Sequence, residues 1–366
     1  MALLYQPTPG AGGIRQDQIT LTERIATTHR IDTLMITHRS ISSLVACAIC
    51  VGTSVLLNAA ENPYLGRWAL TLPNGSAGWL GVEQKGAALS GSLLWGGGSV
   101  LPVASTKVEG DKLVITRTSK AKKKDGAGKE HEETVTETIT GKLAGDNLAL
   151  VTEKAKADGK AFDRATFSGV RIKAMPPAPN LAAVKFGDPV ALFNGKDLTG
   201  WRLIDPRADN GWSVQDGVLM NRVEKGKHFG NLRTAAEFED FNLKLELRTM
   251  AASNSGVYLR GIYEVQVAET FGKPLNPHNM GALYSRITPS VAAEKPPGEW
   301  QTLDITLVDR HLTVILNGKN IIDNQPVLGC TGGALTSDEF KPGPIYLQGD
   351  HSNIDYRNIV LRPVVK

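Results

Sequence analysis

The stretch Asn254-Ser-Gly-Val-Tyr-Leu-Arg-Gly-Ile-Tyr-Glu-Val-Gln-Val-Ala-Glu269 has the pattern of β-strands and carries the most informative polar residues of the chain. Glu264 and Gln266 are two residues apart, so in a strand their side chains share one face, whereas Val265 and Val267 share the other. A buried face that holds Glu, Gln and a nearby Arg is costly unless these groups meet each other or a polar ligand. The pattern indicates a carbohydrate cleft on a sheet, and a solvated face of an antiparallel sheet is the alternative.

Outward from this stretch, residues 185–366 have the pattern of a β-sandwich. Strand-like runs follow one another along this region, and glycine or Asx turns such as Gln215-Asp-Gly217 separate most of them. No long amphipathic helix is visible. We therefore predict an all-β fold in which two antiparallel sheets stack as a jelly roll. The expected strands include residues 241–249, 263–268, 281–284, 300–308 and 354–363.

Residues 61–175 form a separate, smaller unit of unknown function. Alternating runs and turn signals predict an antiparallel meander or barrel of roughly six to eight strands. Its lysine-rich insert, residues 119–131, is expected to be an exposed hairpin tip, with a polyanion contact as the alternative. The proline-rich stretch at residues 176–184, which follows Met175, predicts a stiff linker to the sandwich.

Residues 1–60 are interpreted as an N-terminal extension and a secretory signal. Met35 begins a short basic segment that leads into an apolar run over residues 41–57, with a cleavage point near Ala60, so Met35 is the expected start. A membrane anchor and a lipoprotein, cleaved at Cys47, are the alternatives. The mature chain is therefore expected to be secreted or periplasmic, without stable membrane insertion. Cys330 alone would remain, so no internal disulfide is expected.

The composition of the chain limits the kinds of partner that it is expected to bind. The chain of 366 residues has a net charge of +4, much of it from the lysine run, and shows no basic stripe with interleaved aromatic residues. Nucleic acid is therefore not an expected partner. The 38 glycines and 19 prolines favour β structure with many turns. The sequence does not predict an oligomeric state.

A series of motifs in the second unit resembles a known family. In order they are Leu192-Phe-Asn-Gly-Lys-Asp-Leu-Thr-Gly-Trp201, the Asn254 stretch above, Gly281-Ala-Leu-Tyr284, Pro297-Gly-Glu-Trp300, Leu316-Asn-Gly318 and Tyr356-Arg-Asn-Ile359. Together they resemble the 3-keto-disaccharide hydrolase family, whose fold is similar to the concanavalin-like lectin and glucanase sandwich. The resemblance covers residues 185–366 and does not extend to residues 61–175.

This resemblance implies action on 3-keto-glycosides. A ketone at sugar C3 acidifies the C2 proton, so a base can remove it and the resulting enolate can expel the C1 aglycone before water adds. Such a route needs a base, an acid near the leaving oxygen and help for the enolate oxygen. A lectin-like protein that binds carbohydrate without catalysis is the competing hypothesis, and an ordinary endo-β-glucanase is a third.

Three residues are the catalytic candidates. Glu264 is expected to act as general base or acid, with a structural pairing to Arg260 as the alternative. Arg260 is expected to bind sugar hydroxyls or the enolate oxygen, with a salt bridge to Glu264 or Glu246 as the alternative. His351 is expected to act as acid, base or metal ligand because an imidazole titrates near neutrality, and a surface position is the alternative.

The substrate-binding candidates are polar and aromatic residues near these three. Amide and carboxyl groups orient sugar hydroxyls, and aromatic rings stack on sugar faces, although core packing is the alternative for each ring. No cofactor is certain, and a divalent metal is possible although no metal-binding motif is present. The candidates are Gln266, Gln348, Asp350, Tyr258, Tyr284 and Trp300.

Overall fold

The computed structural model describes residues 62–124, 128–155 and 162–365. Residues 58–366 form one compact unit. The expected signal segment and the tip of the lysine-rich insert, residues 125–127, lie outside the described residues, so both remain predictions. Among the described residues, no helix reaches the length and apolarity that a membrane span requires.

The N-terminal part is a closed antiparallel barrel. Its strand order is β2-β1-β9-β8-β7-β6-β5-β3, and β3 pairs again with β2, so the sheet returns on itself and β4 is attached at β3. The prediction of an antiparallel meander or barrel is confirmed in its closed form. The strands are β1 (Gly66–Thr71), β2 (Ala77–Lys85), β3 (Ala88–Trp95), β4 (Leu101–Pro102), β5 (Ser105–Glu109), β6 (Lys112–Lys124), β7 (Glu130–Ala144), β8 (Asn147–Ala155) and β9 (Phe162–Arg171).

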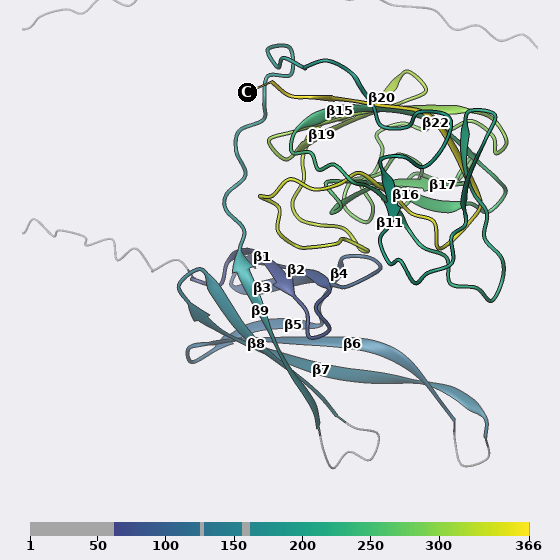
Figure 1. The fold of residues 1–366 in the computed structure, drawn as a ribbon. Helices are drawn as coiled ribbons and strands as arrows, with labels where there is room; N and C mark the ends of the chain where they lie inside the picture. The colour runs from purple at the N-terminus through teal and green to yellow at the C-terminus, as the bar shows by residue number, and fades with distance from the viewer. Residues whose placement is uncertain (1–61, 125–127, 156–161, 366) are drawn as a thin grey trace, which may run out of the picture. The chain divides into compact units, whose positions relative to one another are not determined.

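Alternation along the strands fills the barrel. Trp68, Leu70, Leu113, Ile139 and Leu148 are all buried in one cluster, as inward-facing positions of a small barrel must be. The described residues of the lysine-rich insert lie at the distal end of the hairpin that β6 and β7 form, in keeping with the expected hairpin. Strands β6 and β7 pair from Leu113 to Lys124 and from Glu130 to Gly141, and they form the long hairpin of Figure 1.

The C-terminal part contains two antiparallel sheets. One has the order β12-β13-β22-β15-β18-β19-β20 with β10 attached to β22, and the other has the order β11-β14-β21-β16-β17. The strands are β10 (Val190–Ala191), β11 (Trp201–Leu203), β12 (Trp212–Gln215), β13 (Val218–Asn221), β14 (Leu232–Thr234), β15 (Phe241–Thr249), β16 (Asn254–Leu259), β17 (Tyr263–Ala268), β18 (Gln301–Val308), β19 (His311–Leu316), β20 (Lys319–Pro326), β21 (Tyr346–Leu347) and β22 (Ile354–Pro363).

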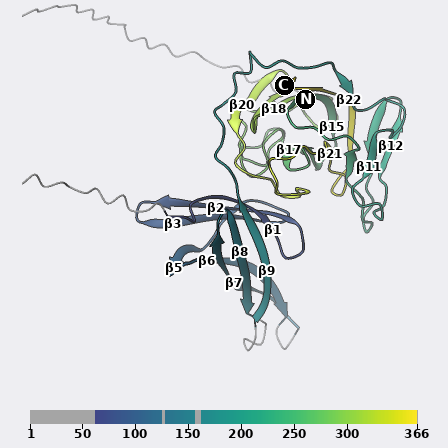
Figure 2. The ribbon, with the colours of Figure 1, turned by 60° about the vertical axis from the view of Figure 1, so that its left-hand side comes forward.

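The two sheets stack face to face around one apolar core. Leu245 and Ile305 come from the eight-stranded sheet, Val257 and Val265 come from the five-stranded sheet, and all four are essentially inaccessible to solvent. Figure 2 shows β15, β18 and β22 in one layer and β17 and β21 in the other. The predicted all-β sandwich of two antiparallel sheets is therefore confirmed.

One expected strand is absent. Residues 281–284 form no regular strand, although they run along the outer edge of β17 and exchange backbone hydrogen bonds with Gln266 and Glu264. Gly281 has a positive φ of 80°, which breaks the extended conformation and favours glycine. The segment therefore covers an edge that would otherwise be unpaired.

Candidate active site

A row of three side chains across the five-stranded sheet defines the site. In the strand register Tyr346 of β21 lies opposite Tyr258 of β16, and Tyr258 lies opposite Glu264 of β17. Residues directly opposite each other in antiparallel strands present their side chains on the same face. The two tyrosine rings stack with centroids 3.8 Å apart, and their hydroxyls donate to the carbonyls of Gly332 and Gly333.

Gly256 makes room for the Glu264 carboxyl group. A Cβ atom at Gly256 would lie 2.5 Å from Glu264 Oε1, which is closer than a real contact allows. The glycine of the Asn254-Ser-Gly motif is therefore required by the carboxylate on the neighbouring strand. The backbone of Glu264 is fixed as well, since its amide donates to Thr331 Oγ1 at 2.9 Å.

Glu264 lines a cavity of about 290 Å³. This volume is at the lower end of the range for small-molecule sites, roughly 300–1,000 Å³. The lining is polar and aromatic, as a sugar site requires, and comes from both the sandwich and the barrel. The lining residues are Gly97, Gly98, Asn231, Asn254, Tyr258, Glu264, Tyr284, Gly332, Gly333, Tyr346, Gln348, Asp350 and His351.

Burial makes Glu264 a weak acid. Glu264 is only 4% exposed, and the loss of solvent around its carboxyl group raises the pKa of that group to about 8. A hydrogen bond with Tyr258 and the charge of His351 oppose the shift, whereas the charge of Asp350 adds to it. Glu264 is consequently protonated at neutral pH and able to donate a proton.

His351 and Asp350 form a pair at the same cavity. His351 Nδ1 lies 2.5 Å from Asp350 Oδ1, and this hydrogen bond raises the pKa of the imidazole above 6.5, against partial burial. Because a carboxylate can only accept a hydrogen bond, Nδ1 of His351 carries the proton and donates it to Asp350. In the neutral ring, Nε2 is then the atom that can accept a proton. This contact orients the imidazole of His351.

Gln348 presents an unused acceptor. Its Oε1 atom is buried and has no hydrogen-bond partner among the described residues. Buried polar atoms are normally paired, so an unpartnered amide oxygen in a polar cavity suits a ligand hydroxyl. Asn231 Oδ1 accepts from the Gly349 amide at 2.8 Å and thereby fixes the loop that carries Asp350 and His351.

Gln266 does not line the cavity. Its residue is 3% exposed, and its amide contacts Asn254 Oδ1 at 3.1 Å. With the amide oriented to satisfy its neighbours, its nitrogen donates to Glu264 Oε1 at 3.1 Å and to the Ser255 carbonyl at 3.2 Å. Of the two roles expected for Gln266, orienting sugar hydroxyls or orienting the base, this contact corresponds to the second.

Arg260 is not part of this cavity. It has a positive φ of 54° and is 4% exposed, and its guanidinium donates to the carbonyls of Glu339 and Lys341. Arg260 does not line the cavity, so its expected catalytic role stays a prediction, and the alternative salt bridge to Glu264 or Glu246 is not formed among the described residues. The turn that follows β16 directs the side chain into a separate hollow, lined in part by Asp240 and Arg310.

Trp300 lies away from the cavity as well. It precedes β18 of the eight-stranded sheet, where the guanidinium groups of Arg248 and Arg357 stand over its ring at 4.8 Å and 3.9 Å. Its expected role in sugar stacking stays a prediction without support from this cavity, and cation–π contacts hold the ring.

The two tyrosine candidates do line the cavity. Tyr258 is 1% exposed and already stacked on Tyr346, so it contributes its hydroxyl edge rather than a free ring face. Tyr284 is partly exposed and stands edge-on to His278 at 4.9 Å. Of the predicted residues, the structure thus brings together Glu264, His351, Gln348, Asp350, Tyr258 and Tyr284.

Several lining residues were not predicted. Asn231 and Tyr346 lie on or beside short strands whose sequences carry no distinctive motif. Gly97 and Gly98 belong to the run Trp95-Gly-Gly-Gly-Ser99 of the barrel, which the sequence shows clearly but which has no local link to the sandwich. In the described part of the chain, no group of three or more His, Cys, Asp or Glu side chains is arranged to hold a metal ion.

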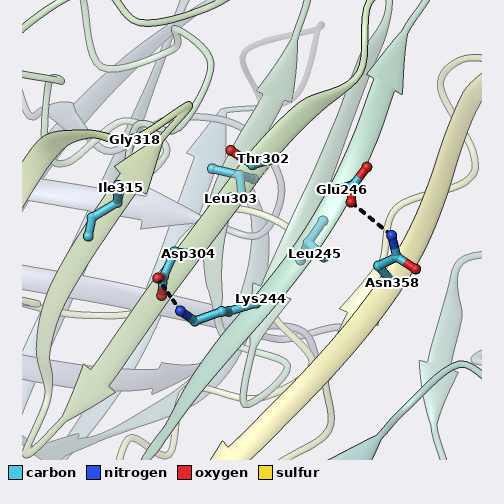
Figure 3. A pocket seen from close by; sticks show the side chains of 9 residues that line it. All are labelled: Lys244, Leu245, Glu246, Thr302, Leu303, Asp304, Ile315, Gly318 and Asn358. Carbon is cyan, nitrogen blue, oxygen red and sulfur yellow. Dashed lines mark hydrogen bonds and ion pairs between the residues drawn. The ribbon is translucent and has the colours of Figure 1, made fainter.

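A second hollow, of about 340 Å³, lies on the eight-stranded sheet (Figure 3). Its polar groups already have partners, since Glu246 accepts from Asn358 at 2.8 Å and Lys244 pairs with Asp304 at 2.8 Å. A surface whose charges are satisfied offers less to a ligand than the cavity around Glu264.

Comparison with known proteins places the sandwich in a family. Residues 188–362 match the family model of the 3-keto-alpha-glucoside-1,2-lyase-like domain, so this part of the chain is a domain of that family. A 3-keto-disaccharide hydrolase of Bacteroides thetaiotaomicron is 24% identical over 166 residues, which cover 37% of this chain. The match spans 57% of the length of that relative.

Solved structures are similar to the same region. A candidate glycosyl hydrolase from Parabacteroides distasonis is 30% identical, with 52% of this chain and 94% of that chain covered and a TM-score of 0.40. A carbohydrate-binding module from Bacillus subtilis is 13% identical, with 44% and 93% covered and a TM-score of 0.30.

Proposed function

We propose that the protein cleaves 3-keto-glycosides by elimination and hydration, with Glu264 as general acid and His351 as general base. The observation that carries the proposal is that a protonated carboxyl group and a carboxylate-oriented imidazole line one small polar cavity. Family membership of the sandwich supports the substrate class.

The steps balance as follows. Nε2 of His351 removes the proton from C2, and the electron pair forms an enolate with the C3 ketone. The enolate then re-forms the ketone as the C1–O bond breaks, and Glu264 gives its proton to the departing oxygen. Water adds to the resulting enone, with hydroxyl at C1 and a proton at C2, to give the free 3-keto sugar.

The order of the two pKa values decides which residue starts as the acid. Two assignments are possible: Glu264 as acid with His351 as base, or the reverse. Both forms of the pair contain the same number of protons, so a pH profile alone does not distinguish them. Burial raises the pKa of Glu264 to about 8, whereas the pKa of His351 starts from 6.5 and is raised by Asp350. We propose this form, with protonated Glu264 and neutral His351, as the working one, because burial disfavours a charge on Glu264 and Asp350 holds Nδ1 of His351, so Nε2 of the neutral ring can accept the C2 proton.

The test is release of aglycone from matched substrates. The full chain is incubated with a 3-keto-glucoside and with the unoxidised glucoside, each with and without a chelator. Release from the keto substrate alone is expected, because only the ketone acidifies C2. Release from both would indicate an ordinary glycosidase, and loss with chelator would add a metal to the mechanism.

Carbohydrate binding without catalysis is the alternative function. The unpartnered Gln348 oxygen and the partly exposed Tyr284 would serve a lectin equally well. Sugar binding by the wild type without release from either substrate would favour it.

Export is proposed on the sequence pattern of residues 35–60. A basic segment followed by an apolar run and small residues supports a cleaved secretory signal. N-terminal sequencing of the protein from its native host tests this, with a mature terminus near Glu61 expected.

A further inference from the structure

A glycine-rich loop of the barrel lies at the cavity of the sandwich. Residues 96–100 connect β3 to β4, and Gly97 and Gly98 line the same cavity as Glu264. All these residues belong to the one compact unit of residues 58–366. This run has no role in the function proposed above.

The contact between loop and sandwich is direct. A Cβ atom at Gly332 would lie 2.1 Å from the carbonyl oxygen of Gly98 and 2.6 Å from its nitrogen, so the two backbones touch and Gly332 could not carry a side chain. Gly96 and Gly98 have φ values of 76° and 86°, a conformation that favours glycine. Glycine is thus favoured at positions 96 and 98 by the backbone conformation, whereas position 97 is free of this constraint.

Polar contacts anchor the loop at its C-terminal end. Ser99 Oγ lies 2.9 Å from His278 Nε2, and the amide of Val100 donates to Ser285 Oγ at 2.9 Å. His278 and Ser285 flank Tyr284, whose ring lines the cavity and stands against the His278 imidazole. The loop is therefore tied to the segment that covers the edge of β17.

We infer that the barrel completes the active site, with Gly97 and Gly98 as a specificity-determining wall that limits the substrate to short 3-keto-glycosides. The inference rests on the proposed function for its substrate class. A cavity of about 290 Å³ with a wall from a second domain suits one or two sugar rings, whereas an endo-acting enzyme on a polymer needs a cleft open at both ends.

Gly97 is the position at which to test the wall. An added Cβ atom there meets nothing within 4 Å, and its φ is not in the left-handed region, so a side chain fits the backbone without strain. Phenylalanine at this position would place a ring in open space beside the cavity. Gly97→Ala is the smaller variant, and Val108→Phe adds the same ring at an exposed position of β5 that lines no part of the cavity.

The experiment uses the full chain and two substrates, methyl 3-keto-α-glucoside and the disaccharide in which glucose replaces the methyl group. Gly97→Phe is expected to lower kcat/KM for the disaccharide by about 10- to 100-fold and for the methyl glycoside much less. Gly97→Ala should also lower kcat/KM more for the disaccharide than for the methyl glycoside, but by a smaller factor. Val108→Phe should have the kcat/KM values of the wild type. Equal kcat/KM values for wild type and Gly97→Phe, or equal losses on both substrates, would overturn the inference.

Calorimetric titration with the same two glycosides separates this inference from the proposed function. A wild type that binds them without cleavage would defeat the proposed reaction, and selective loss of disaccharide binding in Gly97→Phe would still support the wall. Unchanged dissociation constants in Gly97→Phe would overturn it. A wild type that neither binds nor cleaves overturns both.

Discussion

The two sheets of the sandwich each contain a glutamate, and the pKa values of the two carboxyl groups are shifted in opposite directions. Glu264 on the five-stranded sheet is buried and forms no salt bridge with a described Lys or Arg side chain, and desolvation raises its pKa to about 8. Glu246 on the eight-stranded sheet is partly buried, which also raises its pKa, but hydrogen bonds from Asn358 and Arg357 outweigh burial and hold the pKa below 4.5. Figure 3 shows the Asn358 contact.

This difference separates a structural carboxylate from a functional one. A paired carboxylate stays charged and holds strands together, whereas an unpaired buried carboxyl group keeps a proton that it can give to a substrate. Asp355 follows the structural pattern, since Arg222 and Arg248 both pair with it at the eight-stranded sheet. Pairing rather than residue type therefore decides the role.

The largest expected effect is on turnover. Glu264→Gln keeps the shape of the side chain and removes its transferable proton, so kcat/KM on a 3-keto-glucoside should fall by about 10²- to 10⁴-fold. Glu246→Gln is the matched control and should leave kcat/KM within about threefold of the wild type, because its partners lie on the other sheet. Full activity in Glu264→Gln would remove the distinction between the two carboxylates.

Stability at alkaline pH is the next effect. The pKa of Glu264 rises from 4.5 in the unfolded chain to about 8 in the fold, so its contribution to stability is fully present below pH 4.5 and is lost as pH rises through 8. Glu264→Gln should therefore be more stable than the wild type at pH 9, by up to about 4–5 kcal/mol, since a tenfold change in proton affinity is worth about 1.4 kcal/mol.

Urea unfolding of both proteins at pH 5 and pH 9 measures this difference. Glu246→Gln should behave in the opposite sense, since its lowered pKa stabilises the fold above pH 4.5 and this gain is lost as pH falls. If Glu264→Gln gave no relative gain at pH 9, Glu264 would not be buried uncharged.

A smaller effect concerns the base. Asp350→Asn removes the carboxylate that raises the pKa of His351, so the acidic limb of the kcat/KM profile should move to lower pH and kcat should fall by roughly tenfold. Asp205→Asn is the control, because Asp205 pairs with Arg207 on an exposed loop. An acidic limb that stays in place would exclude His351 as the titrating base.

The smallest effect is expected at Trp300. Trp300→Ala removes the ring between Arg248 and Arg357, so the free energy of unfolding should fall by about 1–2 kcal/mol. The kcat/KM value should stay within about twofold of the wild type. A large loss of activity at an unchanged free energy of unfolding would instead indicate that Trp300 contacts the substrate.

The pattern of the chain predicted more of the fold than of the site. Alternation and turns are local signals, so β15, β17, β18 and β22 were predicted close to their observed bounds. The strand predicted over residues 281–284 is absent, because Gly281 breaks the extended conformation. Strand β11 was not predicted, because its three residues carry too little of the alternating pattern. The domain boundaries and the leader segment stay predictions.

Arg260 shows why the site was harder to predict. It is near Glu264 in sequence, but the turn after β16 has a left-handed residue and sends its guanidinium to the carbonyls of Glu339 and Lys341. The position of Trp300 was hard to predict for a related reason, since a motif gives the order of residues and not the sheet to which each belongs.

The sequence by itself determined the all-β class, the sandwich and the shared face of Glu264 and Gln266, because the strand period of two is a local property. Only the tertiary structure decided that Glu264 is buried, that Gln266 is left out of the cavity lining and that Gly97 and Gly98 of the barrel line that cavity. Burial, pairing and the approach of distant backbones depend on contacts between segments far apart in the chain, and no local pattern encodes them.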